Sequence, residues 1–412
     1  MPGRATPPPE ETMGTPDTIA VESAHMPPFF AKTPISIARG EGVWVWDEEG
    51  RRYLDLTAGW GVTSIGHSHP AIVRALAEQG ARIIQNPDSG LTYSPPRARL
   101  LELIAGILPS GLTRVFFTNS GAEANDAAVK LARKATGRTD VIATDGSFHG
   151  RTISMVSATG QAKHRDKFRP LMPGYRFVPY GSVDAVQAAL DEDVAAMIVE
   201  PVQGEGGVRI PAPDYLRQLS RLCRANGSLL VVDEVQTGFC RTGPLFATSA
   251  AGAEADFLTM AKGIAGGFPL GAFAMTEAVA ARLEAGDHGG TYCGNPLACA
   301  VADAVIRQLI DDDIPTHVDE LGRAALARMT SWGERFAPVV TGARGVGLLL
   351  LVEFRDEATA GAVAAECLRR GVFVRQTQGD GIRVFPALTI TAGELDEGLT
   401  ALEESIAAVA AG

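Results

Sequence analysis

The stretch F-L-T-M-A-K-G-I-A-G-G-F-P-L-G, from Phe257 to Gly271, decides the fold. Its first residues form a short apolar run, and a glycine-rich turn follows Lys262 directly. Upstream, the run S-L-L-V-V-D is also apolar and also ends at a charged residue, Asp233. Short apolar runs bounded by turn residues are typical of buried strands in a parallel sheet.

Lys262 and Asp233 also indicate a chemistry. Apolar surroundings disfavour the charged form of a lysine amine, so its pKa falls and it can attack a carbonyl. A carboxylate at the end of a buried strand needs a cationic or hydrogen-bonding partner. A lysine for a Schiff base and an acid for a pyridinium nitrogen together suggest pyridoxal phosphate (PLP). Taken alone, Lys262 could instead pack its stem on glycines while its amine reaches water.

Bulk properties exclude several classes of protein. The 412 residues suffice for two or three domains, and the net charge of −11 argues against binding to nucleic acid or anionic membranes. No secretory signal and no run of about 18 apolar residues is found. The five cysteines form no C-x-x-C pair, which indicates free thiols in a reducing compartment. We therefore expect a cytoplasmic protein.

Apolar runs and helical patterns divide the chain. Residues 1–28 are rich in proline and acidic residues and are expected to be mobile or to wrap a neighbour. Residues 29–69 are assigned to a small domain and contain a hairpin that turns at Glu49-Gly50. In residues 70–310, apolar runs near 114, 140, 195, 229 and 256 alternate with helical patterns, which predicts a large domain with a mostly parallel sheet. Residues 311–412 predict a smaller α/β domain with helices at about 358–370 and 392–411.

Polar segments follow the predicted strands, and open α/β sheets bind ligands at that edge. In N-S-G-A-E-A-N, from Asn119, a strand ends and a helix begins, so free backbone N–H groups form an anion site. Ser120 also suits an N-cap, with Glu123 completing a capping box, and both interpretations can hold together. In S-F-H-G-R-T, Phe148 offers a flat face and Arg151 a possible carboxylate contact; ordinary packing and a surface ion pair are the alternatives.

Six motifs occur in a fixed order: N-S-G-A-E-A-N, F-H-G-R-T, E-P-V-Q-G-E-G-G, D-E-V-Q-T-G-F-C-R-T-G, A-K-G-I-A-G-G-F-P-L-G-A and G-G-T-Y-C-G-N-P-L-A-C. Over roughly residues 30 to 408, the chain resembles the class III PLP-dependent aminotransferases, of the acetylornithine, ornithine and 4-aminobutyrate aminotransferase kind. The resemblance implies PLP-dependent transferase fold type I. It also implies a homodimer with shared active sites.

The resemblance assigns roles around the cofactor. Lys262 would bind PLP as a Schiff base and then move a proton between the substrate carbon and C4′, while Asp233 would keep the pyridine nitrogen protonated. Thr291 of the partner subunit would reach the phosphate. Glu200 would support the cofactor, or form a salt bridge that holds its loop. The resemblance also implies that Gln236 contacts the ring hydroxyl and that Val235 and Phe148 contact the two faces of the ring. The phosphate would be held by Ser120, Gly121 and Ala122.

Substrate recognition is assigned to charged residues. Arg383 would bind an α-carboxylate and Arg151 a distal carboxylate, which suits 2-oxoglutarate or glutamate. Glu205 would neutralise Arg383 when the amino donor presents no carboxylate there. Trp60 departs from the small aliphatic residue or tyrosine usual at this position. The segment that begins at Gln85 and the pair Tyr292-Cys293 also differ from the residues usual at these positions in the family.

These assignments predict an aminotransferase that moves a terminal amino group from a donor such as N-acetylornithine to 2-oxoglutarate, giving an aldehyde and glutamate. Alternative donors are 4-aminobutyrate, ornithine or a diamine such as putrescine. Two other functions are alternatives. The protein could be an aminomutase, which would need no 2-oxoglutarate, or a non-catalytic binding protein that uses only the anion site. His67 and His69 resemble a metal pair but match a structural turn in the family, so we expect no metal.

Overall fold

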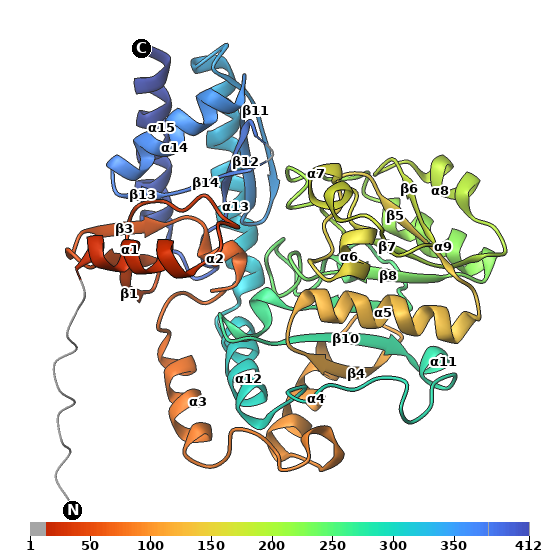
Figure 1. Ribbon diagram of the computed structural model, residues 1–412. Coiled ribbons are helices and arrows are strands. Elements are labelled where there is room, and N and C mark those ends of the chain that lie inside the picture. The colour runs from red at the N-terminus through yellow and green to blue at the C-terminus, as the bar shows by residue number, and fades with distance from the viewer. Residues whose placement is uncertain (1–13, 378, 412) are drawn as a thin grey trace, which may run out of the picture.

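The computed structural model describes residues 14–377 and 379–411. Residues 1–13, part of the proline-rich segment predicted to be mobile, lie outside the described residues, as do residues 378 and 412. Figure 1 shows a large sheet flanked by helices, and a second region, coloured red and blue, that combines the two ends of the chain. Two smaller sheets lie in this second region.

The large sheet has seven strands in the order β4-β10-β9-β8-β7-β5-β6. Only β10 runs antiparallel to its neighbours, so the predicted mostly parallel sheet is confirmed. The five predicted runs are all strands; β6 and β10 were not predicted. The strands are β4 (Leu112–Thr118), β5 (Asp140–Thr144), β6 (Tyr175–Val178), β7 (Val194–Val199), β8 (Leu229–Asp233), β9 (Phe257–Met260) and β10 (Gly271–Thr276).

Helices cover both faces of this sheet because its strands are apolar on both sides. Ile198 and Val231 pack in one cluster with α5, whereas Val199 and Val232 pack in another with α9. Figure 1 shows helices on both sides of the sheet. The helices of this region are α5 (Gly121–Thr136), α6 (Ile153–Ala158), α7 (Ala162–Arg165), α8 (Val183–Ala189), α9 (Tyr215–Asn226), α10 (Ala247–Ala250) and α11 (Glu277–Ala280), with 3-10 turns η2 (Asp166–Phe168) and η3 (Lys262–Ala265).

The second region joins residues that are far apart in sequence. One sheet has the order β1-β2-β3-β13, and the parallel pairing of Val372 with Leu54 unites the N-terminal strands with the C-terminal part. The other sheet has the order β11-β12-β15-β14. The predicted hairpin and both predicted C-terminal helices are present. The strands are β1 (Ile37–Glu41), β2 (Trp44–Asp47), β3 (Arg52–Asp55), β11 (Val340–Val346), β12 (Leu349–Phe354), β13 (Val372–Phe373), β14 (Arg375–Thr377) and β15 (Gly381–Val384).

Long helices connect the two regions. In Figure 1, α12 and α13 run one after the other from beside the large sheet to the C-terminal helices. No helix among the described residues combines the length and apolarity needed to cross a membrane. The remaining helices are α1 (Thr15–His25), α2 (Ala58–Gly61), α3 (Pro70–Gly80), η1 (Ser89–Leu91), α4 (Pro95–Ile107), α12 (Pro296–Asp311), α13 (Ile314–Arg335), α14 (Glu357–Arg369) and α15 (Ala392–Ala411).

Candidate active site

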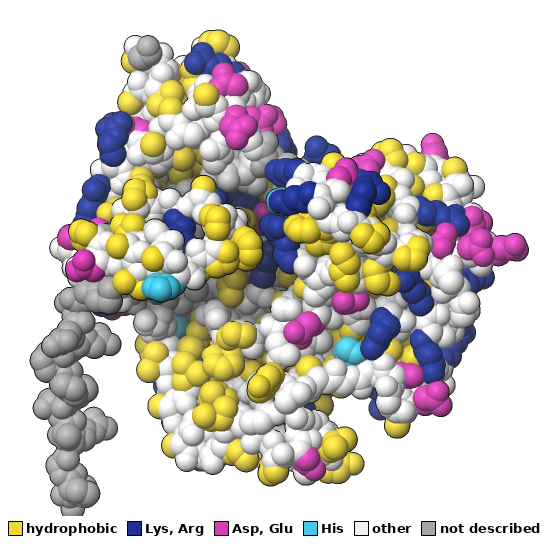
Figure 2. Space-filling model, in the orientation of Figure 1, with side chains coloured by type: hydrophobic (Ala, Val, Ile, Leu, Met, Phe, Trp, Pro, Cys, Tyr) yellow, Lys and Arg dark blue, Asp and Glu magenta, His cyan; other side chains and the backbone are white. Residues whose placement is uncertain are grey.

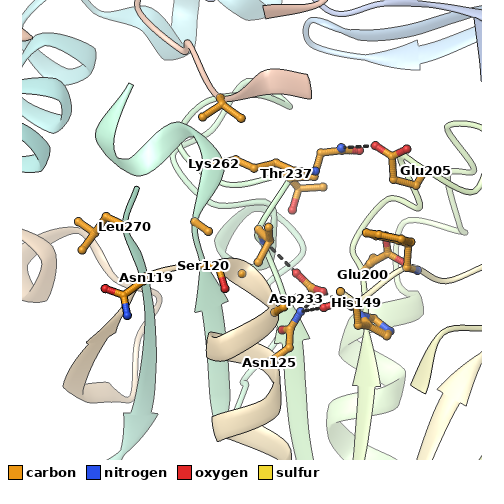
Figure 3. Close-up of a pocket in the computed structure, with 18 of the residues that line it drawn as sticks. Asn119, Ser120, Asn125, His149, Glu200, Glu205, Asp233, Thr237, Lys262 and Leu270 are labelled. Atoms are coloured by element: carbon orange, nitrogen blue, oxygen red, sulfur yellow. Dashed lines mark hydrogen bonds and ion pairs between the residues drawn. The ribbon is translucent and has the colours of Figure 1, made fainter. Parts of the chain in front are cut away.

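A cavity of about 350 Å³ lies at the edge of the large sheet where the parallel strands end. It forms there because the turns after β4, β5, β7, β8 and β9 meet at one edge. Ten of the predicted site residues line this cavity (Figure 3): Ser120, Gly121, Ala122, Phe148, Glu200, Glu205, Asp233, Val235, Gln236 and Lys262.

Lys262 follows β9 and begins the turn η3. Its φ of +41° is a backbone conformation that a lysine rarely adopts and that occurs mostly at functional sites. Burial of the amine lowers the pKa of Lys262, although the nearby Glu205 carboxylate acts in the opposite direction. Its side chain extends into the cavity in Figure 3, so the amine that burial affects lies at the cavity.

Asp233 ends β8 and is buried at the floor of the cavity. Its Oδ2 accepts hydrogen bonds from Asn125 Nδ2 and His149 Nδ1, both at 2.7 Å. Asn125 is held in turn by the Thr259 hydroxyl, which donates to Asn125 Oδ1 at 2.6 Å. Sequence reasoning gave Asn125 and His149 no role, although both lie within motifs that it singled out. The three side chains form one fixed polar network.

The helix α5 points its N-terminus at the cavity. Ser120 caps it by accepting a hydrogen bond from the Glu123 N–H at 3.2 Å, as predicted. The capping box is different from the one expected: the Glu123 carboxylate accepts from the backbone N–H of Asn119 at 2.7 Å, not from that of Ser120. A Cβ on Gly121 would lie 2.7 Å from a methyl carbon of Val235, so only glycine allows this close approach.

Two apolar side chains line the cavity from different turns. Phe148 and Val235 both line the cavity, one on the turn after β5 and the other on the turn after β8. The Phe148 backbone N–H donates to the Glu200 carboxylate at 3.2 Å. Burial, followed by the Asp233 charge, raises the pKa of Glu200 well above its usual value. Glu200 therefore holds the Phe148 turn and makes no ion pair with any cation in the described part of the chain, so the predicted salt bridge is absent.

Glu205 and Gln236 link the cavity to the second region. The Glu205 carboxylate accepts from Arg383 Nη1 at 2.8 Å and from Gln236 Nε2 at 2.9 Å. Arg383, on β15, is only 3% exposed. Burial alone would raise the pKa of Glu205, but the charges of Arg383 and Lys262 and these hydrogen bonds lower it to about 2. Glu205 and Arg383 therefore form an ion pair in this structure.

The other predicted residues lie outside this cavity. Trp60 and Arg383 line a second cavity that also includes Arg375. Arg151 is exposed, with its guanidinium carbon 5.4 Å from the centroid of the Phe148 ring. Thr291 is exposed on the loop before α12, and its carbonyl accepts from Gln85 at 2.6 Å.

His67 and His69 have separate structural roles. His67 Nε2 contacts the Asp55 carboxylate at 2.9 Å, whereas the His69 ring accepts from the Ala71 N–H and caps α3. Among the described residues, no group of three or more histidine, cysteine, aspartate or glutamate side chains could hold a metal ion.

The fold and the cavity together define an α/β enzyme with a buried, activated lysine. The description "Aminotransferase class-III" applies to the family whose model matches residues 27–406, and the chain belongs to this family. It is 43% identical to the acetylornithine aminotransferase of Methanothermobacter thermautotrophicus over 95% of this chain and 98% of that one. The acetylornithine aminotransferase of Methanopyrus kandleri is 45% identical over 94% and 98%. The ornithine aminotransferase structure from Toxoplasma gondii superposes with a TM-score of 0.92, at 33% identity, covering 97% and 96%. The chain is therefore an aminotransferase.

Proposed function

We propose that this aminotransferase uses PLP to move the terminal amino group of N-acetylornithine, or a close relative, to 2-oxoglutarate. The single observation that carries the proposal is the shared cavity. The amine of Lys262, the carboxylate of Asp233 and the N-terminus of α5 all face it. A carbonyl-reactive amine, an acid for a ring nitrogen and an anion site are the groups that PLP requires.

The residues of the cavity fit PLP. Gln236 Oε1 is buried and has no hydrogen-bond partner among the described residues, so it is available to a ring hydroxyl. The backbone N–H groups of Gly121 and Ala122, with the Ser120 hydroxyl, would hold the phosphate at the start of α5. The faces of the ring would contact Phe148 and Val235. When bound, PLP supplies an electron-accepting ring that stabilises negative charge on the substrate carbon.

The chain's own groups then have defined tasks. Asp233, oriented by Asn125 and His149, would hold a proton on the ring nitrogen, because its carboxylate is fixed and buried. Lys262 would hold the cofactor covalently and would carry the proton that leaves the substrate carbon, because burial makes its amine more readily neutral. Glu200 keeps the Phe148 turn in place against the ring.

The two substrates share one pocket through Glu205. When 2-oxoglutarate binds, its α-carboxylate takes Arg383 from Glu205, and Arg151 binds the distal carboxylate. When the donor presents its terminal amine, Glu205 stays paired with Arg383. The names of both curated relatives, acetylornithine aminotransferase, support N-acetylornithine as the donor.

A homodimer completes the site in this proposal. Thr291 does not line the cavity of its own chain, and it is exposed. Exposed apolar side chains lie on the same loops, among them Ile84, Leu91, Tyr93 and Tyr292. Figure 2 shows apolar side chains gathered over α3 and α4 on the lower part of the molecule. Covering this surface with a second copy would bring Thr291 of the partner subunit to the phosphate.

A donor screen tests the proposal. Glutamate formation from 2-oxoglutarate is followed with N-acetylornithine, ornithine, 4-aminobutyrate and putrescine, and the highest kcat/KM is expected for N-acetylornithine. Lys262→Ala should lose both turnover and the visible absorption of the bound cofactor. Lys134→Ala, which removes a surface ion pair with Glu284, should keep both. Turnover that needs no 2-oxoglutarate would instead indicate an aminomutase.

A further inference from the structure

A basic segment borders the active-site cavity. The ten residues Q-A-K-H-R-D-K-F-R-P, from Gln161 to Pro170, contain four cations and one acid, in a chain whose net charge is −11. They form α7 and η2, which follow the Phe148 turn and α6. Figure 2 shows Lys and Arg side chains gathered in the part of the molecule where Figure 1 places α7, beside the hollow between the two regions. Positive charge is therefore concentrated on one short segment.

His164 connects this segment to the cavity. Its ring packs edge-on against the ring of Phe148, with the two centroids 5.9 Å apart, and Phe148 lines the cavity. The guanidinium carbon of Arg151 lies 5.4 Å from the centroid of the same Phe148 ring. Burial lowers the pKa of His164, and the charges of Lys163 and Lys167 add to this effect. The electric fields of both lysines therefore reach the side chain that packs on the wall of the cavity.

The four cations of this segment differ in their partners. Asp166 accepts hydrogen bonds from Arg165 Nε at 3.0 Å and from Arg169 Nη2 at 3.3 Å. Among residues 14–377 and 379–411, no carboxylate lies within ion-pair distance of Lys163 or Lys167, and both lysines are exposed. The two lysine charges are therefore available to an anion that approaches from solvent.

The two proposed substrates differ in net charge. 2-Oxoglutarate has two carboxylates and is a dianion at neutral pH, because carboxylic acids ionise well below it. N-acetylornithine has one carboxylate and one ammonium group, so its charges cancel. The net negative charge of the chain repels a dianion, whereas positive charge beside a cavity raises the local concentration of the dianion and its rate of entry. Exposed lysines at this place would therefore act on the acceptor and leave the donor nearly unaffected.

We propose that Lys163 and Lys167 form a lysine rim that attracts dicarboxylate substrates such as 2-oxoglutarate to the active-site cavity. This inference rests on the proposed function, because it concerns the acceptor named there. The rim acts before binding: its charges attract the dianion through water, and the substrate then passes to Arg151 and Arg383. Salt screens exposed charges, with a Debye length of about 30 Å at 0.01 M and about 3 Å at 1 M ionic strength. The contribution of the rim should therefore disappear at high salt.

Binding of glutarate tests the lysine rim on the PLP-loaded enzyme. Glutarate is an unreactive dianion with the same carbon chain length as 2-oxoglutarate, and its Kd can be measured by calorimetry at low and high ionic strength. At about 10 mM, the double variant Lys163→Gln, Lys167→Gln should raise the Kd about fourfold, the effect of two charges on a dianion through water over roughly 10–15 Å. At about 0.5 M, the Kd should agree with that of the wild type within about 1.5-fold.

A matched control removes the same net charge elsewhere. The double variant Arg224→Gln, Arg323→Gln changes two exposed arginines on α9 and α13 that form surface ion pairs with Glu254 and Asp319. Its Kd for glutarate should stay within about 1.5-fold of the wild-type value at both ionic strengths, because screening weakens distant exposed charges.

Rapid mixing with the two proposed substrates separates attraction from catalysis. In the lysine variant at low salt, kcat/KM for 2-oxoglutarate should fall about fourfold, while the rate at saturating 2-oxoglutarate stays unchanged, because the rim acts before the substrate is bound. The half-reaction with N-acetylornithine should change less than about 1.5-fold. A lower rate at saturation, or an equal effect on both substrates, would show that the lysines only support the structure of α7.

The outcomes distinguish the lysine rim from the reaction. An unchanged affinity for glutarate at low salt, a loss of affinity that persists at high salt, or no binding of glutarate would each overturn the rim. Failure of the proposed function shows differently, as a lack of glutamate formation from 2-oxoglutarate with every donor while the salt-dependent difference in glutarate affinity persists.

Discussion

Replacing Glu205 with glutamine should move the two half-reactions in opposite directions. The carboxylate of Glu205 competes with a substrate carboxylate for Arg383. Its pKa lies at about 2, against an ordinary value of 4.5, so the folded site favours the ionised form by about 3 kcal/mol. Removing this charge should lower the KM for 2-oxoglutarate about tenfold, because the substrate carboxylate no longer has to displace Glu205 from Arg383.

The donor half-reaction should become slower in the same variant. With N-acetylornithine bound, Arg383 would remain buried without its carboxylate, and an uncompensated buried charge is unfavourable. The arginine would also attract the donor's own carboxylate and hold the donor in the wrong direction. We expect kcat/KM for N-acetylornithine to fall tenfold or more, on the order of 1.4 kcal/mol.

Rapid-mixing measurements of the cofactor absorbance can follow each half-reaction separately. Glu277→Gln is the matched control, because Glu277 also pairs with an arginine, Arg114, at 2.6 Å on the surface. Neither half-reaction should change in the control. Equal changes in both half-reactions of Glu205→Gln, or no change in either, would refute the exchange of partners at Arg383.

Three further outcomes follow from the first cavity. Asn125→Ala removes a donor at 2.7 Å from the buried Asp233 and should lower the free energy of unfolding by about 1–3 kcal/mol, measured by chemical denaturation; a loss below about 0.5 kcal/mol would contradict the network. Gly121→Ala should weaken PLP binding, measured by titration of the cofactor-free protein, because its Cβ has no room, whereas Gly106→Ala on an open helix face should not. Since burial lowers the pKa of Lys262 from 10.5, its amine becomes neutral at a lower pH than an ordinary lysine; the rate of PLP recombination should reach half its maximum below pH 10.5, and a midpoint at or above that value would refute the environment described.

The sequence predicted the parallel strands because each combined an apolar run with a following turn. It did not predict β10, whose small residues in G-A-F-A-M-T have weak strand propensity and continue from a glycine-rich turn. The short strand β6 lies between prolines and carries little periodic pattern. A strand with a clear apolar run can therefore be predicted from the sequence alone. A strand that is short or made of small residues forms because neighbouring strands of the fold pair with it.

The site residues were predictable to the extent that each belongs to a local motif. Asn125 and His149 lie within two such motifs, but only the fold shows that both side chains reach Asp233, which is 108 and 84 residues away in sequence. Arg375 is in no motif, and its position opposite Arg383 depends on the register of β14 and β15. Contacts between distant segments are set by tertiary packing, so a single sequence cannot specify them.

Arg241 would keep the junction between the two regions fixed during the proposed exchange of partners at Arg383. It is buried, and its Nη1 donates to the carbonyls of Leu348 at 2.9 Å and Pro386 at 2.7 Å. Burial lowers the pKa of Arg241 to about 9, and no carboxylate in the described chain pairs with it. Backbone carbonyls neither titrate nor leave when a substrate carboxylate arrives. The guanidinium carbons of Arg241 and Arg383 lie 4.2 and 4.9 Å from the centroid of the Phe385 ring, so Arg241 anchors the ring beside which Arg383 would change partners in the proposed exchange.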